Sequence, residues 1–443
     1  MKGIFKHIYL EFRFFVSLIS FAFLFLMAYQ FPGLLPISIM LFGVFMVLVF
    51  VDSILLFKQK GLEAKRLLPE KLSNGDDNPI EISLKNAYNF KVHLKLIDEL
   101  PFQYQKRDFE IETDLEKLSD KKITYTLRPL ERGEYHFGNL NVYVTSPIGL
   151  LTRRFQFGKD AMVPNYPSFL QLKKYMLLAF SNRIFDFGLK KIRRIGNTME
   201  FEQIKEYVRG DDIRNINWKA TAKRNHLMVN QFQDERSQPI YSVIDKGRAM
   251  KMPFNGLSLL DYAINATLVI SNVAIKKQDK AGMFAFSQKV ANKVVAERRP
   301  SQMNLIMETL YNLDTDFSEP DFSRLYIDIK RSLNQRSLLL LYTNFETLDA
   351  LHRQLPYLQA IAKNHVLVVI FFENTELDKL TQKKSKNTFE IFEKTIAKKF
   401  VYEKKLIISE LQKYGIQSIL TPPEDLTLNT INKYLEIKAR GLI

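Results

Sequence analysis

The stretch FFVSLISFAFLFLMAY, from Phe14 to Tyr29, contains no charged residue, and a second uncharged stretch runs from Leu34 to Val51. Each approaches the roughly 20 apolar residues that a helix needs to cross the core of a bilayer. A secretory signal peptide would end in a small-residue cleavage site, which the first stretch lacks, and a second apolar stretch would not follow it at once. Residues 1–60 are therefore predicted to form a transmembrane helical hairpin with a short, uncharged connection.

The charges around the hairpin predict its orientation. Basic residues precede the first helix and follow the second: Lys2, Lys6 and Arg13, then Lys58, Lys60, Lys65 and Arg66. Loops rich in lysine and arginine stay on the cytoplasmic side, so we expect both ends of the hairpin and the remaining chain to lie in the cytoplasm. Asp52, near the end of the second helix, is expected to be an interfacial carboxylate that reaches water rather than part of an ion pathway.

Residues 61–170 show alternating apolar and polar positions, which is typical of strands with one buried face. The clearest alternations are Ile80/Ile82/Leu84, Val92/Leu94/Leu96, Ile123/Tyr125/Leu127 and Leu140/Val142/Val144. Turn residues separate them, as at Arg132-Gly133 and Ser146-Pro147. Several short strands with this spacing predict a β-sandwich domain that acts as a spacer or an interaction module.

Residues 239–443 alternate short apolar runs with helical patterns. The runs are Ile240–Ile244, Ala281–Phe286, Ser337–Thr343, Val366–Phe372 and Ile416–Thr421, and helices are expected at Leu259–Ile275, Gln302–Leu313 and Leu348–Ala362. Strands without polar alternation are buried on both faces, as in a parallel sheet. The fold class is therefore a multidomain α/β chain with a membrane anchor, in which residues 239–443 form a Rossmann-like, doubly wound sheet and residues 171–238 link it to the β-sandwich.

Composition excludes several classes of function. The chain has no cysteine and six histidines, which rules out disulfides, thiolate metal sites and cysteine nucleophiles. No GxGxxG, phosphate-binding loop or GxSxG motif is present, so no cofactor and no enzymatic activity are expected. The formal charge of +16 suits an anionic lipid surface. The basic run Lys190–Arg194 lacks interleaved aromatic residues, so nucleic-acid binding is not expected.

The linking segment includes EFEQIKEYVRGDDIRNINWKATAKRNHLMV, from Glu200 to Val229. Ile213, Ile216 and Ala220 would share one face of a helix, and Asp211 or Asp212 would cap that helix and pair with Arg209 or Arg214. Adjacent carboxylates point in different directions, so this pair is not expected to be catalytic. A contribution to a docking surface is the functional alternative to simple packing.

This segment resembles the signature of a bacterial family, domain-of-unknown-function family 58. The matching residues are Tyr207, Gly210, Asp211, Asp212, Arg214, Ile216, Trp218, Ala220 and Ala222, with Lys205 and Lys223 where arginine is usual. Further landmarks are Arg132-Gly133-Glu134-Tyr135, Ser146-Pro147-Ile148-Gly149-Leu150 and Val163-Pro164. The resemblance implies a von Willebrand factor A-like domain at residues 239–443 and a partner of the MoxR type, which is an AAA+ ATPase. It implies no established catalytic activity.

These observations together predict an adaptor or chaperone-like interaction protein of the bacterial cytoplasmic membrane. Its candidate interaction residues are Arg209, Gly210, Asp211, Asp212, Arg214, Trp218 and Lys223. The alternative is a cation-dependent receptor of the von Willebrand A type, whose family motif D-x-S-x-S supplies oxygen ligands for Mg²⁺. Here Asp245 matches its first position, but Gly247 and Ala249 replace the serines, so the site is expected to be degenerate and without metal.

Overall fold

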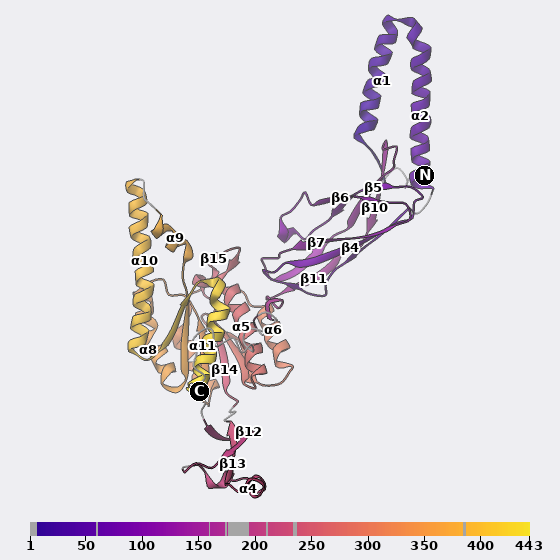
Figure 1. Ribbon diagram of the computed structural model, residues 1–443. Helices are drawn as coiled ribbons and strands as arrows, with labels where there is room; N and C mark the ends of the chain where they lie inside the picture. Colours follow the sequence, from indigo (N-terminus) through magenta and orange to yellow (C-terminus); the bar gives the residue numbers. More distant parts are fainter. Residues whose placement is uncertain are drawn as a thin grey trace. The chain divides into compact units, whose positions relative to one another are not determined.

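The computed structural model describes residues 7–58, 61–158, 160–172, 175, 195–209, 211–233, 237–383 and 387–443 (Figure 1). The chain divides into two compact units, Met1–Tyr166 and Pro167–Ile443, and each is considered by itself. Gly210 and the basic run Lys190–Arg194 lie outside the described residues.

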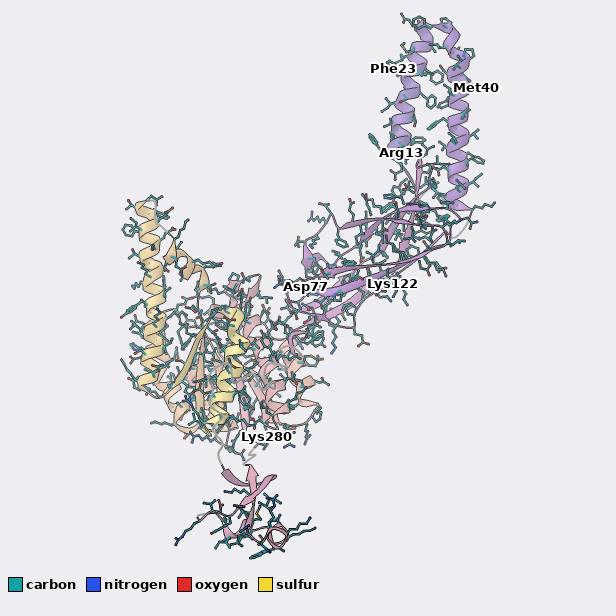
Figure 2. All side chains as sticks on the ribbon, viewed as in Figure 1. Arg13, Phe23, Met40, Asp77, Lys122 and Lys280 are labelled. Carbon is teal, nitrogen blue, oxygen red and sulfur yellow. The ribbon has the colours of Figure 1, made fainter. Side chains whose placement is uncertain are left out.

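The first unit begins with a helical hairpin. Helix α1 (Phe12–Gln30) and helix α2 (Leu35–Phe57) are joined by the short turn η2 (Pro32–Leu34). Both are long and apolar enough to cross a membrane, as the sequence predicts. Phe21 packs against Phe42 and Phe45 between the helices, whereas side chains such as Phe23 and Met40 are exposed on the outside of the hairpin (Figure 2).

The remainder of the first unit is β-structure, in agreement with the period-two pattern. A five-stranded sheet has the order β1-β10-β9-β5-β6, and two three-stranded sheets have the orders β2-β4-β7 and β3-β11-β8. Ile82 and Leu84 of the second sheet share a core with Leu94 and Val142 of the first. The strands are β1 (Ile8–Leu10), β2 (Leu62–Leu67), β3 (Leu72–Ser73), β4 (Asn78–Asn86), β5 (Val92–Asp98), β6 (Glu110–Leu115), β7 (Asp120–Leu127), β8 (Gly133–Phe137), β9 (Leu140–Thr145), β10 (Leu151–Phe157) and β11 (Ala161–Tyr166).

Asp52 of α2 corrects one expectation. Its side chain is fully buried instead of reaching water. The carboxylate accepts hydrogen bonds from the N–H groups of Leu150 and Leu151, at 3.1 and 2.9 Å, and from the hydroxyl of Ser146. A buried carboxylate requires such partners because it has lost its water. The end of α2 is thus hydrogen-bonded to the segment that precedes β10.

The second unit is built on a six-stranded sheet with the order β18-β17-β14-β19-β20-β21. Neighbouring strands are parallel except for β18, which pairs antiparallel with β17 at one edge. The strands are β14 (Pro239–Asp245), β17 (Lys280–Phe286), β18 (Val290–Glu297), β19 (Leu338–Tyr342), β20 (Val366–Phe372) and β21 (Gln417–Thr421). The parallel sheet is confirmed, whereas the edge strand β18 is not predicted from the sequence, because Asn292 lies among its less exposed positions and Val295 is exposed, so its residue types do not follow the alternation of its burial.

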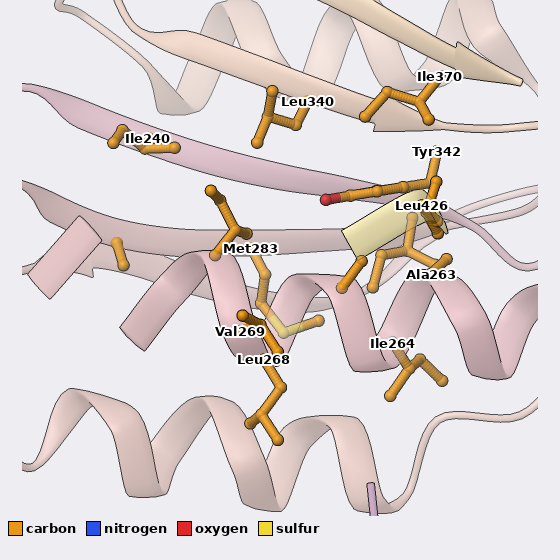
Figure 3. Close-up of a cluster of buried hydrophobic side chains, with 14 of the residues drawn as sticks. Ile240, Ala263, Ile264, Leu268, Val269, Met283, Leu340, Tyr342, Ile370 and Leu426 are labelled. Atoms are coloured by element: carbon orange, nitrogen blue, oxygen red, sulfur yellow. The ribbon is translucent and has the colours of Figure 1, made fainter. Parts of the chain in front are cut away.

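Helices cover both faces of this sheet. One face packs against α5 (Leu259–Lys276), α6 (Gln302–Tyr311) and α11 (Leu426–Ala439), and the other against α7 (Phe322–Ser332), α8 (Leu348–Asn364) and α10 (Thr388–Lys413). Figure 3 shows the first of these layers, in which Met283 and Leu340 of the strands belong to the same buried cluster as Leu268 and Val269 of α5. Helix α9 (Thr375–Gln382) and the strands β15 (Pro253–Phe254) and β16 (Leu257–Ser258) lie in connections after strands of the sheet.

The linking segment contains an antiparallel pair, β12 (Ile195–Glu206) and β13 (Met228–Gln233), which the sequence analysis does not anticipate. Between these strands lie the turn η5 (Ile213–Asn215) and the helix α4 (Trp218–Arg224). The expected single helix is therefore wrong. Ile216 adopts an extended conformation and forms a bridge to Val229, which separates the turn from the helix.

Candidate functional site

Short-range hydrogen bonds shape the segment at residues 204–209 and 211–230, which we call the signature lobe. Asp211 accepts hydrogen bonds from the N–H of Val208 at 3.0 Å and from Lys205 Nζ at 2.8 Å. Asp212 caps η5 by accepting the N–H of Arg214, and Asn217 caps α4 by accepting the N–H of Ala220. The first backbone N–H groups of a turn or helix have no carbonyl partner within it, and these side-chain oxygens accept their hydrogen bonds instead.

The two aspartates therefore have structural partners, and the ion pair differs from the predicted one. The partner of Asp211 is Lys205, which holds the pKa of that carboxyl below its usual range together with the Val208 N–H. Among the described residues, neither Asp211 nor Asp212 forms an ion pair with the guanidinium group of Arg209 or Arg214; of Arg214, Asp212 contacts only the backbone N–H. The expected capping role is confirmed for Asp212.

Large apolar side chains of the signature lobe face solvent. Ile213 is 70% exposed, Trp218 69% and Val208 63%. From its spacing, Ile213 is expected to pack on a helical face, and this is wrong because the extended Ile216 interrupts the helix. Large exposed apolar side chains occur at interaction surfaces, and tryptophan is enriched at the energetic centres of such surfaces.

The signature lobe also carries exposed cations. They are Arg209, Arg214, Lys219, Lys223 and Arg224, and all are exposed to solvent. Arginine presents a planar fork of donors that suits carboxylates, and lysine supplies a compact charge. The lobe thus offers exposed apolar side chains together with exposed cations, and it includes every described residue of the predicted interaction set.

A second candidate lies at the carboxyl end of β14, where ligands bind in open α/β sheets. Asp245 is buried, and its carboxylate accepts hydrogen bonds from the Gly247 N–H and the Thr343 hydroxyl, each at 2.7 Å. Burial raises the pKa of Asp245 to about 6. The flanking Lys246 instead lies 3.7 Å from Asp316, so it does not hold the Asp245 pKa down.

Gly247 explains part of the departure from the metal-binding motif. A Cβ atom at this position would lie 2.8 Å from Pro320 Cδ and 3.0 Å from the Ser318 carbonyl oxygen. A serine there would force the neighbouring loop to shift. Ala249 also lacks a side-chain oxygen, so Asp245 has no ligand-bearing neighbours at the two motif positions that normally assist it.

Two cavities adjoin the carboxyl end of the sheet and share Asn344 and Glu346 in their walls. The smaller, about 210 Å³, includes Asp245 and Arg248. The larger, about 240 Å³, is mostly apolar and includes Phe400 and Lys404 of α10. Sequence reasoning missed the larger cavity because its walls come from residues far apart in the chain.

Lys404 lines the larger cavity together with other charged residues, Glu346, Glu373, Glu376 and Lys405. Its ammonium donates hydrogen bonds to Asn344 Oδ1 and to the Phe345 carbonyl oxygen, and burial lowers its pKa to about 8. A lysine in such a setting can bind an anionic group beside apolar walls. The cavity therefore suits a ligand or peptide side chain that is mainly apolar.

Solved structures of other proteins resemble only about a quarter of this chain. A PapD-like domain of human CEP192 is 14% identical, covering 24% of this chain and 83% of that chain with a TM-score of 0.18. The CARDB domain of PF1109 from Pyrococcus furiosus is 13% identical, covering 24% and 94%, with a TM-score of 0.16. Likenesses this weak carry no argument.

Sequence relationships are more informative. The uncharacterized protein YeaD of Bacillus subtilis is 24% identical over 218 residues, which are 47% of this chain. The chain spans about half the length of that curated relative, 54%. Residues 203–381, which contain most of the signature lobe and the sheet from β14 to β20, match the family described as "Protein of unknown function DUF58".

Proposed function

We propose that this protein is a membrane-anchored interaction protein whose signature lobe binds a protein partner in the cytoplasm. The observation that carries the proposal is the exposure of Trp218, 69%, and of Ile213, 70%, in a segment that also carries exposed cations. Exposed tryptophan has a large apolar area that water solvates poorly, so covering it with a partner is favourable. The exposed cations of the same segment favour a partner with an acidic surface.

The proposed partner is a MoxR-type AAA+ ATPase. This choice rests on the resemblance of Glu200–Val229 to the family signature, and the match of residues 203–381 to that family supports it. The role is that of an adaptor or chaperone-like subunit, with no catalysis of its own. Helices α1 and α2 would hold it in the bacterial cytoplasmic membrane, with the remaining chain in the cytoplasm.

The β-structure of the first unit is proposed to be a β-sandwich spacer. The sheet of the second unit is proposed to be a von Willebrand factor A-like domain with a degenerate metal site. The parallel strand order and the position of Asp245 at the end of β14 support this assignment.

Co-purification from native membranes in mild detergent tests the proposal. The wild-type chain is expected to retain the ATPase, and the Arg214→Glu/Lys219→Glu variant is expected to lose it because two exposed cations of the signature lobe become acidic. Thermal unfolding should be unchanged, since both side chains are exposed. Absence of the ATPase from the wild-type complex, when it is present in the extract, would refute this partner.

One observation favours a second candidate function, a cation-dependent ligand-binding receptor. Asp245 adjoins the smaller cavity and has the Thr343 hydroxyl beside it, so two potential oxygen ligands are already together. Direct measurement of Mg²⁺ binding distinguishes this candidate from the first.

A further inference from the structure

Helix α10 carries an apolar stripe that nothing in the described part of the chain covers. Phe389, Phe392, Ile396 and Phe400 have the spacing that places side chains on one side of a helix, and they are 70%, 65%, 53% and 39% exposed. The same side of α10 is buried farther along, at Ile407 and Leu411, where it packs against the sheet. In Figure 1 the N-terminal end of α10 extends beyond the strands.

The stripe is not explained by packing within its own unit. Ala397, on another side of α10, is buried, whereas exposure along the stripe rises steadily from Phe400 to Phe389. Ile391, which does not belong to the stripe, is also 55% exposed. The first turn of α10 therefore presents apolar side chains to solvent on more than one side. The stripe ends at the larger cavity, whose wall includes Phe400. Such a surface needs a partner of low polarity.

The charges around the stripe indicate which partner. Between Lys383 and Lys405 the sequence has eight lysines and three glutamates. Lys398, Lys399 and Lys405 are exposed on α10 itself. A helix with phenylalanine and isoleucine on one side and lysines on the others is typical of helices that lie in the interface of a bilayer.

We propose that the N-terminal half of α10 binds the surface of an anionic bilayer, with Phe389, Phe392 and Ile396 inserted among the lipids. The inference rests on the membrane attachment proposed above, because the hairpin would keep a bilayer within reach of the chain. Each lysine near an anionic surface strengthens such a contact about fivefold. A second copy of the chain is a poorer occupant, because pairing two stripes would bring two lysine-rich segments together.

The absence of cysteine from the sequence makes a direct test possible. The full chain is placed in lipid nanodiscs with a single cysteine, labelled with an environment-sensitive fluorophore, at one of three positions. Ile396→Cys reports on the stripe, Thr395→Cys is an exposed control beside the stripe, and Met40→Cys reports on the hairpin. Nitroxide-bearing lipids then quench any label that is in contact with the bilayer.

The proposal predicts quenching at Ile396→Cys and Met40→Cys but not at Thr395→Cys, in discs that contain phosphatidylglycerol. Lys398→Glu and Lys405→Glu should each weaken the contact at Ile396→Cys about fivefold or more, with no effect at Met40→Cys. Quenching at Met40→Cys without quenching at Ile396→Cys would overturn the inference and leave the anchor intact. No quenching at either position would overturn both.

Two further outcomes assign the stripe to another occupant. A blue shift at Ile396→Cys in detergent that grows with protein concentration would indicate a second copy of the chain. A shift that requires added AAA+ ATPase would indicate the protein partner. Either result, without quenching by lipid, contradicts the proposal.

Discussion

Asp52 Oδ2 accepts a hydrogen bond from the backbone N–H of Leu151 at 2.9 Å, which joins the end of α2 to the first residue of β10. Two neighbouring contacts reinforce the junction: Arg153 Nη1 donates to the Leu56 carbonyl oxygen at 2.6 Å, and the Tyr88 hydroxyl donates to the same oxygen at 2.8 Å. The hairpin and the β-structure of the first unit therefore form one hydrogen-bonded body.

Replacement of Asp52 tests this junction. Asp52→Ala leaves the N–H groups of Leu150 and Leu151 buried without a partner and is expected to destabilise the first unit by about 2–4 kcal/mol. Asp52→Asn retains one acceptor oxygen, so it should fall between the alanine variant and the wild type. Thermal unfolding in detergent, followed by circular dichroism, measures the difference. Equal stability of all three proteins would show that the contact contributes nothing.

The orientation of the hairpin is tested with single cysteines and a membrane-impermeant maleimide. Gly33→Cys lies in the turn between α1 and α2, where an added Cβ meets no atom within 4 Å. Lys122→Cys lies on β7, where the lysine side chain is 71% exposed (Figure 2). In intact spheroplasts Gly33→Cys should react, whereas Lys122→Cys should react only after permeabilisation. The reverse pattern would place the soluble units outside the cytoplasm.

Asp245 predicts a pH dependence of stability. Its folded pKa of about 6 exceeds the ordinary value of 3.8, so the folded state binds more protons between these values and stability falls as the pH rises from about 4 to about 6. Asp245→Asn does not titrate and should remove this loss, stabilising the protein by about 2–3 kcal/mol at pH 7.5. Unfolding curves of both proteins at pH 4.5 and 7.5 measure it. A variant that is less stable at pH 7.5 would contradict the assignment.

Calorimetric titration with Mg²⁺ and Mn²⁺ addresses the alternative receptor function. With Gly247 and Ala249 at the serine positions, the full chain in detergent is expected to show no binding in the micromolar range. Micromolar binding that Asp245→Ala abolishes would favour the receptor over the adaptor.

Much of the fold can be predicted from local patterns. The strands β4, β5, β7 and β9 follow directly from period-two alternation, and β14, β19 and β20 follow from unbroken apolar runs. In both cases the order of apolar and polar residues within the strand itself indicates whether one or both of its faces are buried. The helical hairpin is equally evident from its length and lack of charge.

The features that escaped prediction depend on contacts between distant residues. Asp52 has its hydroxyl partner at Ser146, 94 positions along the chain, so the sequence around Asp52 gives no sign of its burial. The spacing of Ile213 to Ile216 and Ala220 predicts that it lies on a helical face, but the Ile216–Val229 bridge interrupts that helix. The exposure of Trp218 likewise depends on this tertiary arrangement rather than on residue type.

The central claim is that the exposed apolar group of the signature lobe binds the AAA+ ATPase. The most direct measurement is the affinity of purified ATPase for the full chain in nanodiscs, compared with Ile213→Ala/Trp218→Ala and with Phe102→Ala, which removes an equally exposed aromatic residue from the first unit. We predict roughly 30-fold weaker binding for the double variant and wild-type affinity for the control. Equal affinity of all three proteins, or no binding by the wild type, would contradict the account.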